Sequence, residues 1–158
     1  MITNSIANIV VATALINAPI QPMEDLNEVL CMTEAIYFEA RGEDRIGKTI
    51  VGLVVKNRVQ SDKYPNTVCE VINQRWQFSY NNDGQPVVNL PNRRVPDAQA
   101  LKESVQLAID ISNGHIADFT NGSLHYFAQD VVLPQWASYG EIELVYGNHT
   151  VINNIRNR

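Results

Sequence analysis

The sequence contains few cysteines and no long apolar segment. Two cysteines, Cys31 and Cys69, occur in 158 residues, which is too few for a disulfide-rich scaffold and lacks the paired spacing of a zinc site. The longest apolar segment, Ile6–Ile16, is shorter than the about 18–20 residues that cross a bilayer as a helix. We therefore expect no stable membrane span.

Positive charge is scarce toward the C-terminus. The formal net charge is −5, and no Lys or Arg occurs between Ser104 and Ile155, although five acidic residues lie there. A protein that binds nucleic acid needs a basic face to neutralise phosphates. The charge distribution therefore argues against a nucleic-acid partner.

Motifs of several enzyme classes are also missing. The chain has no Gly-x-Ser-x-Gly nucleophile elbow and no glycine-rich phosphate loop. Its three histidines, His115, His125 and His149, do not occur in His-x-x-x-His spacing, whereas a zinc amidase requires about three clustered ligands. We expect neither a metal nor another cofactor.

The residue pattern predicts one α+β domain with the helices first. Helical periodicity, N-caps and glycine stops predict helices over residues 25–41, 44–59 and 98–112, with a short helix from an Asn66 cap to Ile72. Short β-like runs predict strands over residues 124–127, 142–146 and 150–152, the last two joined by a tight turn at Gly147-Asn148. The polar stretch between them, residues 74–96, is predicted to be a long loop.

Residues 1–23 have two interpretations. Their apolar segment has the length of a signal-peptide core, and Ala12-Thr13-Ala14 fits a cleavage site, but no Lys or Arg precedes it. The segment is therefore either a signal peptide or a lead-in that packs on the domain. Residues 24–158 are expected to form a single globular domain.

Glu39 is out of place on the first predicted helix. A projection at 100° per residue puts it on a broad apolar face beside Met32 and Ala35, whereas Glu34 and Arg41 project to the opposite, solvated side. A carboxylate on such a face must be paired, protonated or opened onto a cleft, because unpaired burial costs several kcal/mol.

Two interpretations of Glu39 follow. It forms an ion pair with a basic residue of a neighbouring helix, such as Lys48 or Arg58, or it works as a catalytic acid. Glu43, four residues later, favours the second interpretation, because one carboxyl in an apolar wall and another near solvent separate acid and base roles.

Several motifs recur in the order found in one enzyme family. They are Cys31 to Glu43 (Cys-Met-Thr-Glu-Ala-Ile-Tyr-Phe-Glu-Ala-Arg-Gly-Glu), Lys56-Asn57-Arg58-Val59, Tyr64-Pro65-Asn66-Thr67-Val68-Cys69, Gln77-Phe78-Ser79, His125-Tyr126, Pro134-x-Trp136-Ala137 and Gly147-Asn148-His149. Over about residues 28 to 152 the chain resembles the SleB-type cell wall hydrolases, the spore-cortex-lytic enzyme family. Asp44 stands where many members have Pro, and Phe127 where many have a second His.

The resemblance implies a lysozyme-like fold, in which a helical lobe carries the catalytic glutamate and a small β-containing lobe lies across a glycan cleft. Its substrate would be peptidoglycan glycan strands, cleaved between N-acetylmuramic acid and N-acetylglucosamine by a lytic transglycosylase that leaves 1,6-anhydromuramoyl ends. Muramidase-type hydrolysis of the same bond is the alternative, followed by a zinc amidase or a non-catalytic glycan-binding wall module. Glu39 aligns with the catalytic glutamate.

The resemblance also assigns supporting residues. Glu43 either orients Glu39 or substrate, or caps the following helix. Gln77, Ser79 and Tyr126 are expected to form hydrogen bonds with sugar groups or within their loops and strand. Trp76 and Trp136 either stack on sugar rings or pack in the core.

The two cysteines lie in matched family segments. We expect a Cys31–Cys69 disulfide if the protein is exported, and two buried thiols otherwise. The expected setting is the cell envelope or periplasm, or a host wall if the chain is phage-encoded, and we expect a monomer.

Overall fold

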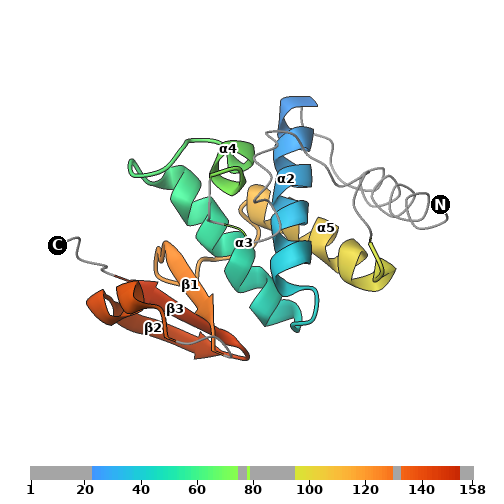
Figure 1. Ribbon diagram of the computed structural model, residues 1–158. Helices are drawn as coiled ribbons and strands as arrows, with labels where there is room; N and C mark the ends of the chain where they lie inside the picture. The colour runs from blue at the N-terminus through green and yellow to red at the C-terminus, as the bar shows by residue number, and fades with distance from the viewer. Residues whose placement is uncertain (1–22, 75–77, 79–94, 130–132, 154–158) are drawn as a thin grey trace.

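A group of helices and a small sheet make up the computed structural model, which describes residues 23–74, 78, 95–129 and 133–153 (Figure 1). The helices are α2 (Met23–Ala40), α3 (Arg45–Gln60), α4 (Val68–Ile72) and α5 (Ala98–Ser112). The sheet contains β1 (His125–Ala128), β2 (Glu141–Tyr146) and β3 (His149–Asn153), with a 3-10 helix, η3 (Gln135–Tyr139), between β1 and β2. The predicted α+β class, helices first, is confirmed.

Side-chain caps fix where three of the helices begin. Asp44 precedes α3 and accepts a hydrogen bond from the Gly47 amide at 3.0 Å, and Asp97 does the same for α5 with the Ala100 amide at 2.9 Å. The predicted cap of α4, Asn66, is wrong by one residue, because the Thr67 hydroxyl accepts from the Glu70 amide. Each cap satisfies a backbone donor that the helix itself leaves unpaired.

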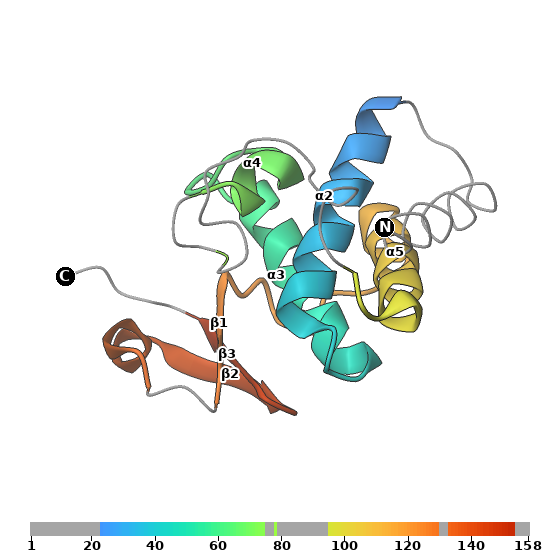
Figure 2. The same ribbon diagram turned by 45° about the vertical axis from the view of Figure 1, so that its right-hand side comes forward.

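Helix α2 is the centre of the helical lobe. It contacts α3, α4 and α5, and Figure 2 shows it between α3 and α5. The main apolar cluster joins one side of α2 to its neighbours: Cys31, Met32, Ala35, Ile36, Leu53, Val55, Leu107 and Ile111.

The opposite side of α2 is buried as well. Tyr37 packs there in a second cluster with Val95, Ala100 and Leu101. Glu34 is only 2% exposed, so its predicted position on a solvated side is wrong. The prediction fails because α5 and the segment around Val95 cover a side of the helix that looks polar in projection.

Cys31 of α2 and Cys69 of α4 form a disulfide. Beside it, the Glu28 carboxylate accepts hydrogen bonds from the Val68 and Cys69 amides at 2.5 and 3.5 Å. A disulfide and two hydrogen bonds therefore attach the short helix α4 to α2.

The sheet is antiparallel with strand order β1-β3-β2. The predicted hairpin between β2 and β3 is confirmed, and Gly147 takes a φ of +54° in its turn, a conformation that favours glycine. Opposite faces differ in exposure: Ile142 and Val145 are 66% and 53% exposed, whereas Tyr126 and Tyr146 reach toward the helical lobe.

Much of the predicted loop over residues 74–96 lies outside the described residues. Of its described members, Phe78 and Val95 are buried, at 1% and 6% exposure. Within the part of the chain that the structure describes, no helix is long and apolar enough to cross a membrane.

Candidate active site

Glu39 lies in the last turn of α2, where the helical lobe meets the sheet. Its side chain is half-buried, and its neighbours on the helix, Ala35 and Ile36, are fully buried. Tyr126 of β1 donates a hydrogen bond from its hydroxyl to Glu39 Oε2 at 3.4 Å. The fold therefore brings together two predicted site residues that are 87 positions apart.

Tyr126 is held as a neutral hydrogen-bond donor. Burial raises its pKa well above the usual value near 10, and the negative charge of Glu39 adds to this effect while Arg58 opposes it. Its ring packs edge-on against the His149 ring with centroids 5.4 Å apart. The hydroxyl proton thus stays available to the carboxyl.

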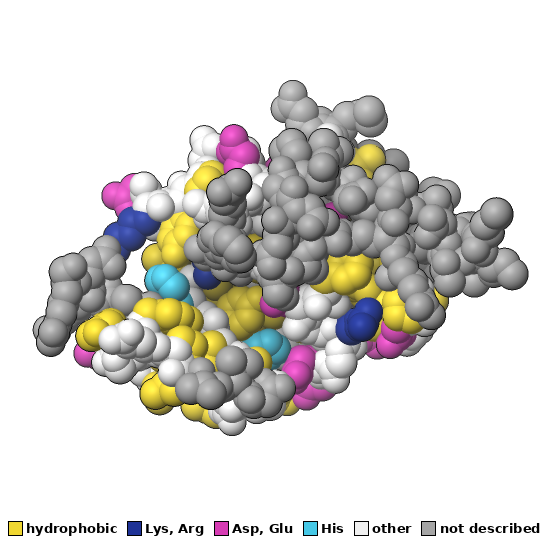
Figure 3. Space-filling view, in the orientation of Figure 1, with side chains coloured by type: hydrophobic (Ala, Val, Ile, Leu, Met, Phe, Trp, Pro, Cys, Tyr) yellow, Lys and Arg dark blue, Asp and Glu magenta, His cyan; other side chains and the backbone are white. Residues whose placement is uncertain are grey.

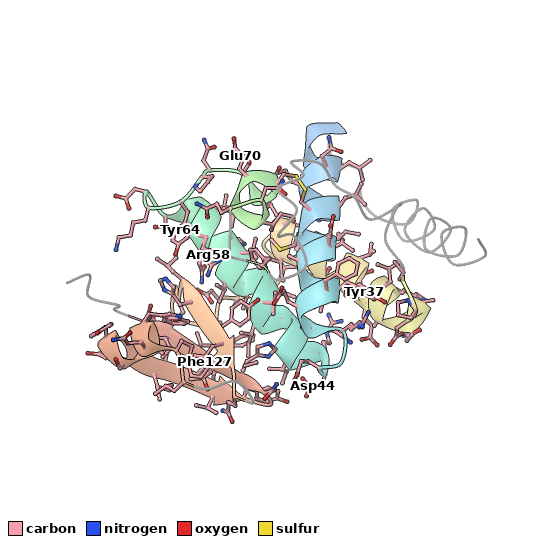
Figure 4. All side chains as sticks on the ribbon, viewed as in Figure 1. Tyr37, Asp44, Arg58, Tyr64, Glu70 and Phe127 are labelled. Carbon is pink, nitrogen blue, oxygen red and sulfur yellow. A yellow bond between two sulfur atoms is a disulfide. The ribbon has the colours of Figure 1, made fainter. Side chains whose placement is uncertain are left out.

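Arg58 brings positive charge to the same place. Figure 4 labels Arg58 on α3 and Tyr64 beyond the C-terminal end of that helix, whereas Asp44 lies at its other end. The Arg58 guanidinium lies over the Tyr64 ring, 5.2 Å from its centroid, and burial lowers its pKa while Glu39, Tyr126 and Tyr64 act in the opposite direction. Of the two basic residues considered as partners of Glu39, Lys48 instead binds Glu103 of α5 at 2.6 Å.

Glu43 does not cap α3, because Asp44 occupies the cap position. The Glu43 carboxylate lies against the β2–β3 turn, so close that a Cβ on Gly147 would be 3.1 Å from Oε2. Its charge acts on His149, whose pKa burial lowers and Glu43 raises. Of the predicted roles, the capping one is therefore wrong.

His149 and His125 have different surroundings in the sheet. His149 is 3% exposed, and its Nδ1 has no hydrogen-bond partner among the described residues. His125 shares a hydrogen bond with the Tyr64 hydroxyl at 3.2 Å, and burial, together with the charges of Arg58 and Lys63, lowers its pKa to about 4. Both rings are therefore neutral near pH 7.

The remaining predicted residues are divided between described and undescribed parts of the chain. Gln77, Ser79 and Trp76 lie outside the described residues. Trp136 is 37% exposed, and its ring packs against His125 and Phe127 at centroid distances of 5.7 and 6.0 Å. The described residues contain no group of three His, Cys, Asp or Glu side chains placed to hold a metal ion.

Arg58 and His149 make contacts near Glu39 that the sequence does not indicate. The sequence marks Arg58 as one of two ion-pair candidates and His149 as a member of a motif, but their neighbours come from distant segments. In Figure 3 a basic side chain is visible in the recess between helices and sheet, and histidine side chains lie on the sheet side.

The family model described as Cell Wall Hydrolase matches residues 42–151. The chain belongs to this family of cell wall hydrolases. Glu39 and Cys31 precede the matched range, so the case for their roles depends on the geometry above and on the motif that contains them.

Curated relatives and solved structures agree with this assignment. The chain is 36% identical over 110 residues to a spore cortex-lytic enzyme of Bacillus cereus and 32% identical to one of Bacillus subtilis. These matches cover 70% of this chain but only 38% and 32% of the relatives. The cell wall hydrolase described here therefore spans about a third of each relative's length.

The structural matches are to isolated catalytic domains. The crystal structure of the catalytic domain of the Bacillus cereus SleB protein has a TM-score of 0.63 and 31% identity, covering 87% of this chain and 96% of that domain. The catalytic domain of the germination-specific lytic transglycosylase SleB from Bacillus anthracis has a TM-score of 0.62 and 32% identity, covering 80% and 94%. The predicted helical lobe with a small β lobe is thus the fold of these domains.

Proposed function

We propose that this cell wall hydrolase degrades peptidoglycan as a lytic transglycosylase, cleaving between N-acetylmuramic acid and N-acetylglucosamine to leave 1,6-anhydromuramoyl ends. The observation that carries the proposal is the half-buried Glu39 carboxyl, which ends an apolar helix face and accepts a hydrogen bond from Tyr126 of the sheet. The likeness to a catalytic domain described as a lytic transglycosylase supports it.

Glu39 acts first as a general acid in this proposal. A glycosidic oxygen leaves poorly until it is protonated, and a carboxyl in an apolar setting can hold a proton near neutral pH. Glu39 gives its proton to the oxygen of the bond as the bond to C1 of the muramoyl sugar breaks. The acetamido group of that sugar stabilises C1 while the leaving sugar departs.

Glu39 acts next as a general base. Its carboxylate takes the proton of the 6-hydroxyl on the same muramoyl sugar, and O6 forms a bond to C1. This step closes the anhydro ring, returns the proton to Glu39 and consumes no water. One carboxyl performs both proton transfers, so the reaction needs no second carboxylate across the bond.

A muramidase is the second candidate, because Glu43 provides another half-buried carboxyl near the site. Hydrolysis by two carboxylates requires them about 5–10 Å apart on either side of the bond. Glu43 instead lies against Gly147 and influences His149. This placement favours a structural role for Glu43 and supports the transglycosylase.

Mass spectrometry of digested peptidoglycan separates the candidates. Purified peptidoglycan is incubated with the protein, with and without a chelator, and the released muropeptides are weighed. We expect anhydro ends in both reactions. Reducing ends, one water heavier, would establish the muramidase, and activity lost to the chelator and restored by zinc would establish the amidase.

Replacing Glu39 tests its proposed role directly. Glu39→Gln keeps the side-chain shape but removes the acid, so turnover should fall by about 10²–10⁴-fold with folding unchanged. Glu143→Gln on exposed β2 is the matched control and should retain wild-type turnover. A general acid contributes at least about 10²-fold to the rate. If Glu39→Gln kept more than about a tenth of wild-type activity, the loss would be too small for this role, and Glu39 would not be the general acid.

We also propose that residues 24–158 form the catalytic domain and that it works outside the cytoplasm, on the producing cell's wall or on a host wall. The Cys31–Cys69 disulfide supports this setting, because disulfides persist mainly in oxidising compartments.

A further inference from the structure

Arg58 is a buried cation at the junction of helices and sheet. Its side chain is 5% exposed, and its Nε donates a hydrogen bond to the Leu124 carbonyl at 2.7 Å. Leu124 directly precedes β1, which begins at His125 and carries Tyr126. The Arg58 side chain therefore ties α3 to the strand that reaches Glu39.

The rest of the Arg58 guanidinium is enclosed by aromatic rings. It lies 5.2 Å from the centroid of Tyr64 and 5.7 Å from that of Phe78. Its Nη1 has no hydrogen-bond partner among the described residues. A buried donor left unpaired is costly, so stability alone does not explain an arginine at this position.

We infer that Arg58 is a positioning residue of the reaction, which holds β1 against α3 and supplies a fixed positive charge near the Glu39 carboxyl. The inference rests on the proposed catalytic role of Glu39. In that role Arg58 stabilises the carboxylate, the form that Glu39 takes once it has given its proton to the leaving oxygen in the first step.

The other cations of α3 bind elsewhere, and Arg45 at its start pairs with Asp110 of α5 at 3.6 Å. Lys48 binds Glu103 of α5, and the Lys56 ammonium donates to the Ile111 carbonyl at the end of α5, at 3.0 Å. Lys56 is only two residues from Arg58 and carries the same charge. It therefore provides a matched control for the loss of one positive charge from this helix.

The titratable groups around Glu39 do not duplicate this charge. Tyr126 stays protonated and neutral, and the pKa values of His125 and His149 on β1 and β3 are lowered, so both rings are neutral near pH 7. Tyr64, beyond α3, contributes a phenol, and Glu43, after α2, contributes a carboxylate. Arg58 is thus a cation whose charge acts on both Glu39 and Tyr126.

The pH profile of activity tests the inference. kcat/KM is measured from pH 4 to 9 on soluble peptidoglycan fragments for wild type, Arg58→Met, Arg58→Lys and Lys56→Met. Removing the charge near Glu39 should raise the pKa of that carboxyl. The alkaline limb of the Arg58→Met profile should therefore move to higher pH by about half a pH unit or more. Arg58→Lys keeps the charge, so its limb should stay at the wild-type position.

The controls make the outcomes separable. Lys56→Met should leave the alkaline limb in place, and Arg58→Gln, which retains a donor for the Leu124 carbonyl, replaces Arg58→Met if the latter does not fold. The inference would be overturned if the alkaline limb of folded Arg58→Met or Arg58→Gln stayed at the wild-type position. It would also be overturned if Lys56→Met shifted that limb by the same amount. Substantial activity in Glu39→Gln would instead overturn the proposed function.

Discussion

The hydrogen bond between Tyr126 and Glu39 affects the two proposed proton transfers differently. A neutral hydroxyl that donates to a carboxylate stabilises the charged form more than the protonated form. Tyr126 therefore supports the step in which Glu39 gives up its proton, as Arg58 does. The apolar side of α2 acts in the opposite sense, and the balance allows one carboxyl to serve in both steps.

Tyr126→Phe tests this bond while keeping the ring that packs on His149. A hydrogen bond to a charged group contributes about 1.5–3 kcal/mol. The bond from Tyr126 to Glu39 is long, at 3.4 Å, so we expect its contribution at the lower end of this range. We expect kcat/KM to fall about tenfold, and circular dichroism should show that the variant remains folded.

Tyr146→Phe is the matched control for this prediction. It removes a hydroxyl from the same face of the sheet, where Tyr146 donates to Asp44 Oδ2 at 2.8 Å, without touching Glu39. Equal losses of activity in the two variants would show that the sheet's docking, rather than the hydroxyl on Glu39, is responsible.

Residues near the site were predictable where a local pattern marks them. Glu39 interrupts an apolar helix face, and that interruption is visible in the sequence alone. Glu34 was misplaced, because its burial comes from α5. Of the two roles expected for Glu43, the capping one was wrong, because Asp44 takes the cap position. The surroundings of Arg58 depend on Leu124, which lies 66 positions away, and no local pattern contains that contact.

Among the helices and strands too, the features marked by a local sequence pattern were predictable, and those that depend on distant contacts were not. Helix α5 matches its predicted limits, because the Asp97 cap and the apolar spacing are both local. The β2–β3 hairpin was predictable from its Gly-Asn turn. The position of β3 between β1 and β2 was not predictable, because the β1–β3 pairing joins His125 to Ile152 and no local pattern contains that contact. The 3-10 helix η3 was not predicted either.

The attachment of α4 to α2 leads to a prediction on stability. The Cys31–Cys69 bond closes a loop with a sequence separation of 38, which contributes on the order of 3–4 kcal/mol in the chain-entropy model. Replacing both cysteines with serine should lower the melting temperature by about 10 °C, measured by calorimetry.

Thiol titration checks the bond itself. Unreduced, denatured protein from an oxidising compartment should contain no free thiol. Two thiols per chain would contradict the disulfide. A serine variant with the melting temperature of the wild type would show that the Glu28 hydrogen bonds and the buried apolar side chains of α4 hold this helix without the disulfide.

The helical lobe and the sheet differ in what holds them together. Among the described residues, neither apolar cluster includes a member of β1, β2 or β3. Polar contacts from α3 and its cap reach the sheet, including Arg58 to Leu124 and Tyr146 to Asp44, and the buried apolar side chains of the sheet include Val151 and Ile152. We therefore expect the sheet to open at a lower free energy than the helices.

Asn57 provides a specific test of this difference. It is 8% exposed, and its amide nitrogen lies within hydrogen-bonding distance of Asp118 Oδ2, Thr120 Oγ1 and the Ser123 carbonyl, at 3.1 to 3.2 Å. Asn57→Ala leaves these acceptors without their donor, which costs about 1–3 kcal/mol. Amide exchange in β1 and β3 should accelerate about tenfold or more, since opening is the rate-determining equilibrium.

Hydrogen exchange followed by mass spectrometry resolves the two lobes within one molecule. Peptides from α2 should exchange in Asn57→Ala as in the wild type, because the apolar cluster around Met32 and Leu107 is untouched. Gln60→Ala, an exposed change at the end of the same helix, should alter neither lobe. Equal acceleration in α2 and the sheet would mean that the chain opens as one cooperative unit, and the polar junction beside Glu39 would then be as stable as the core.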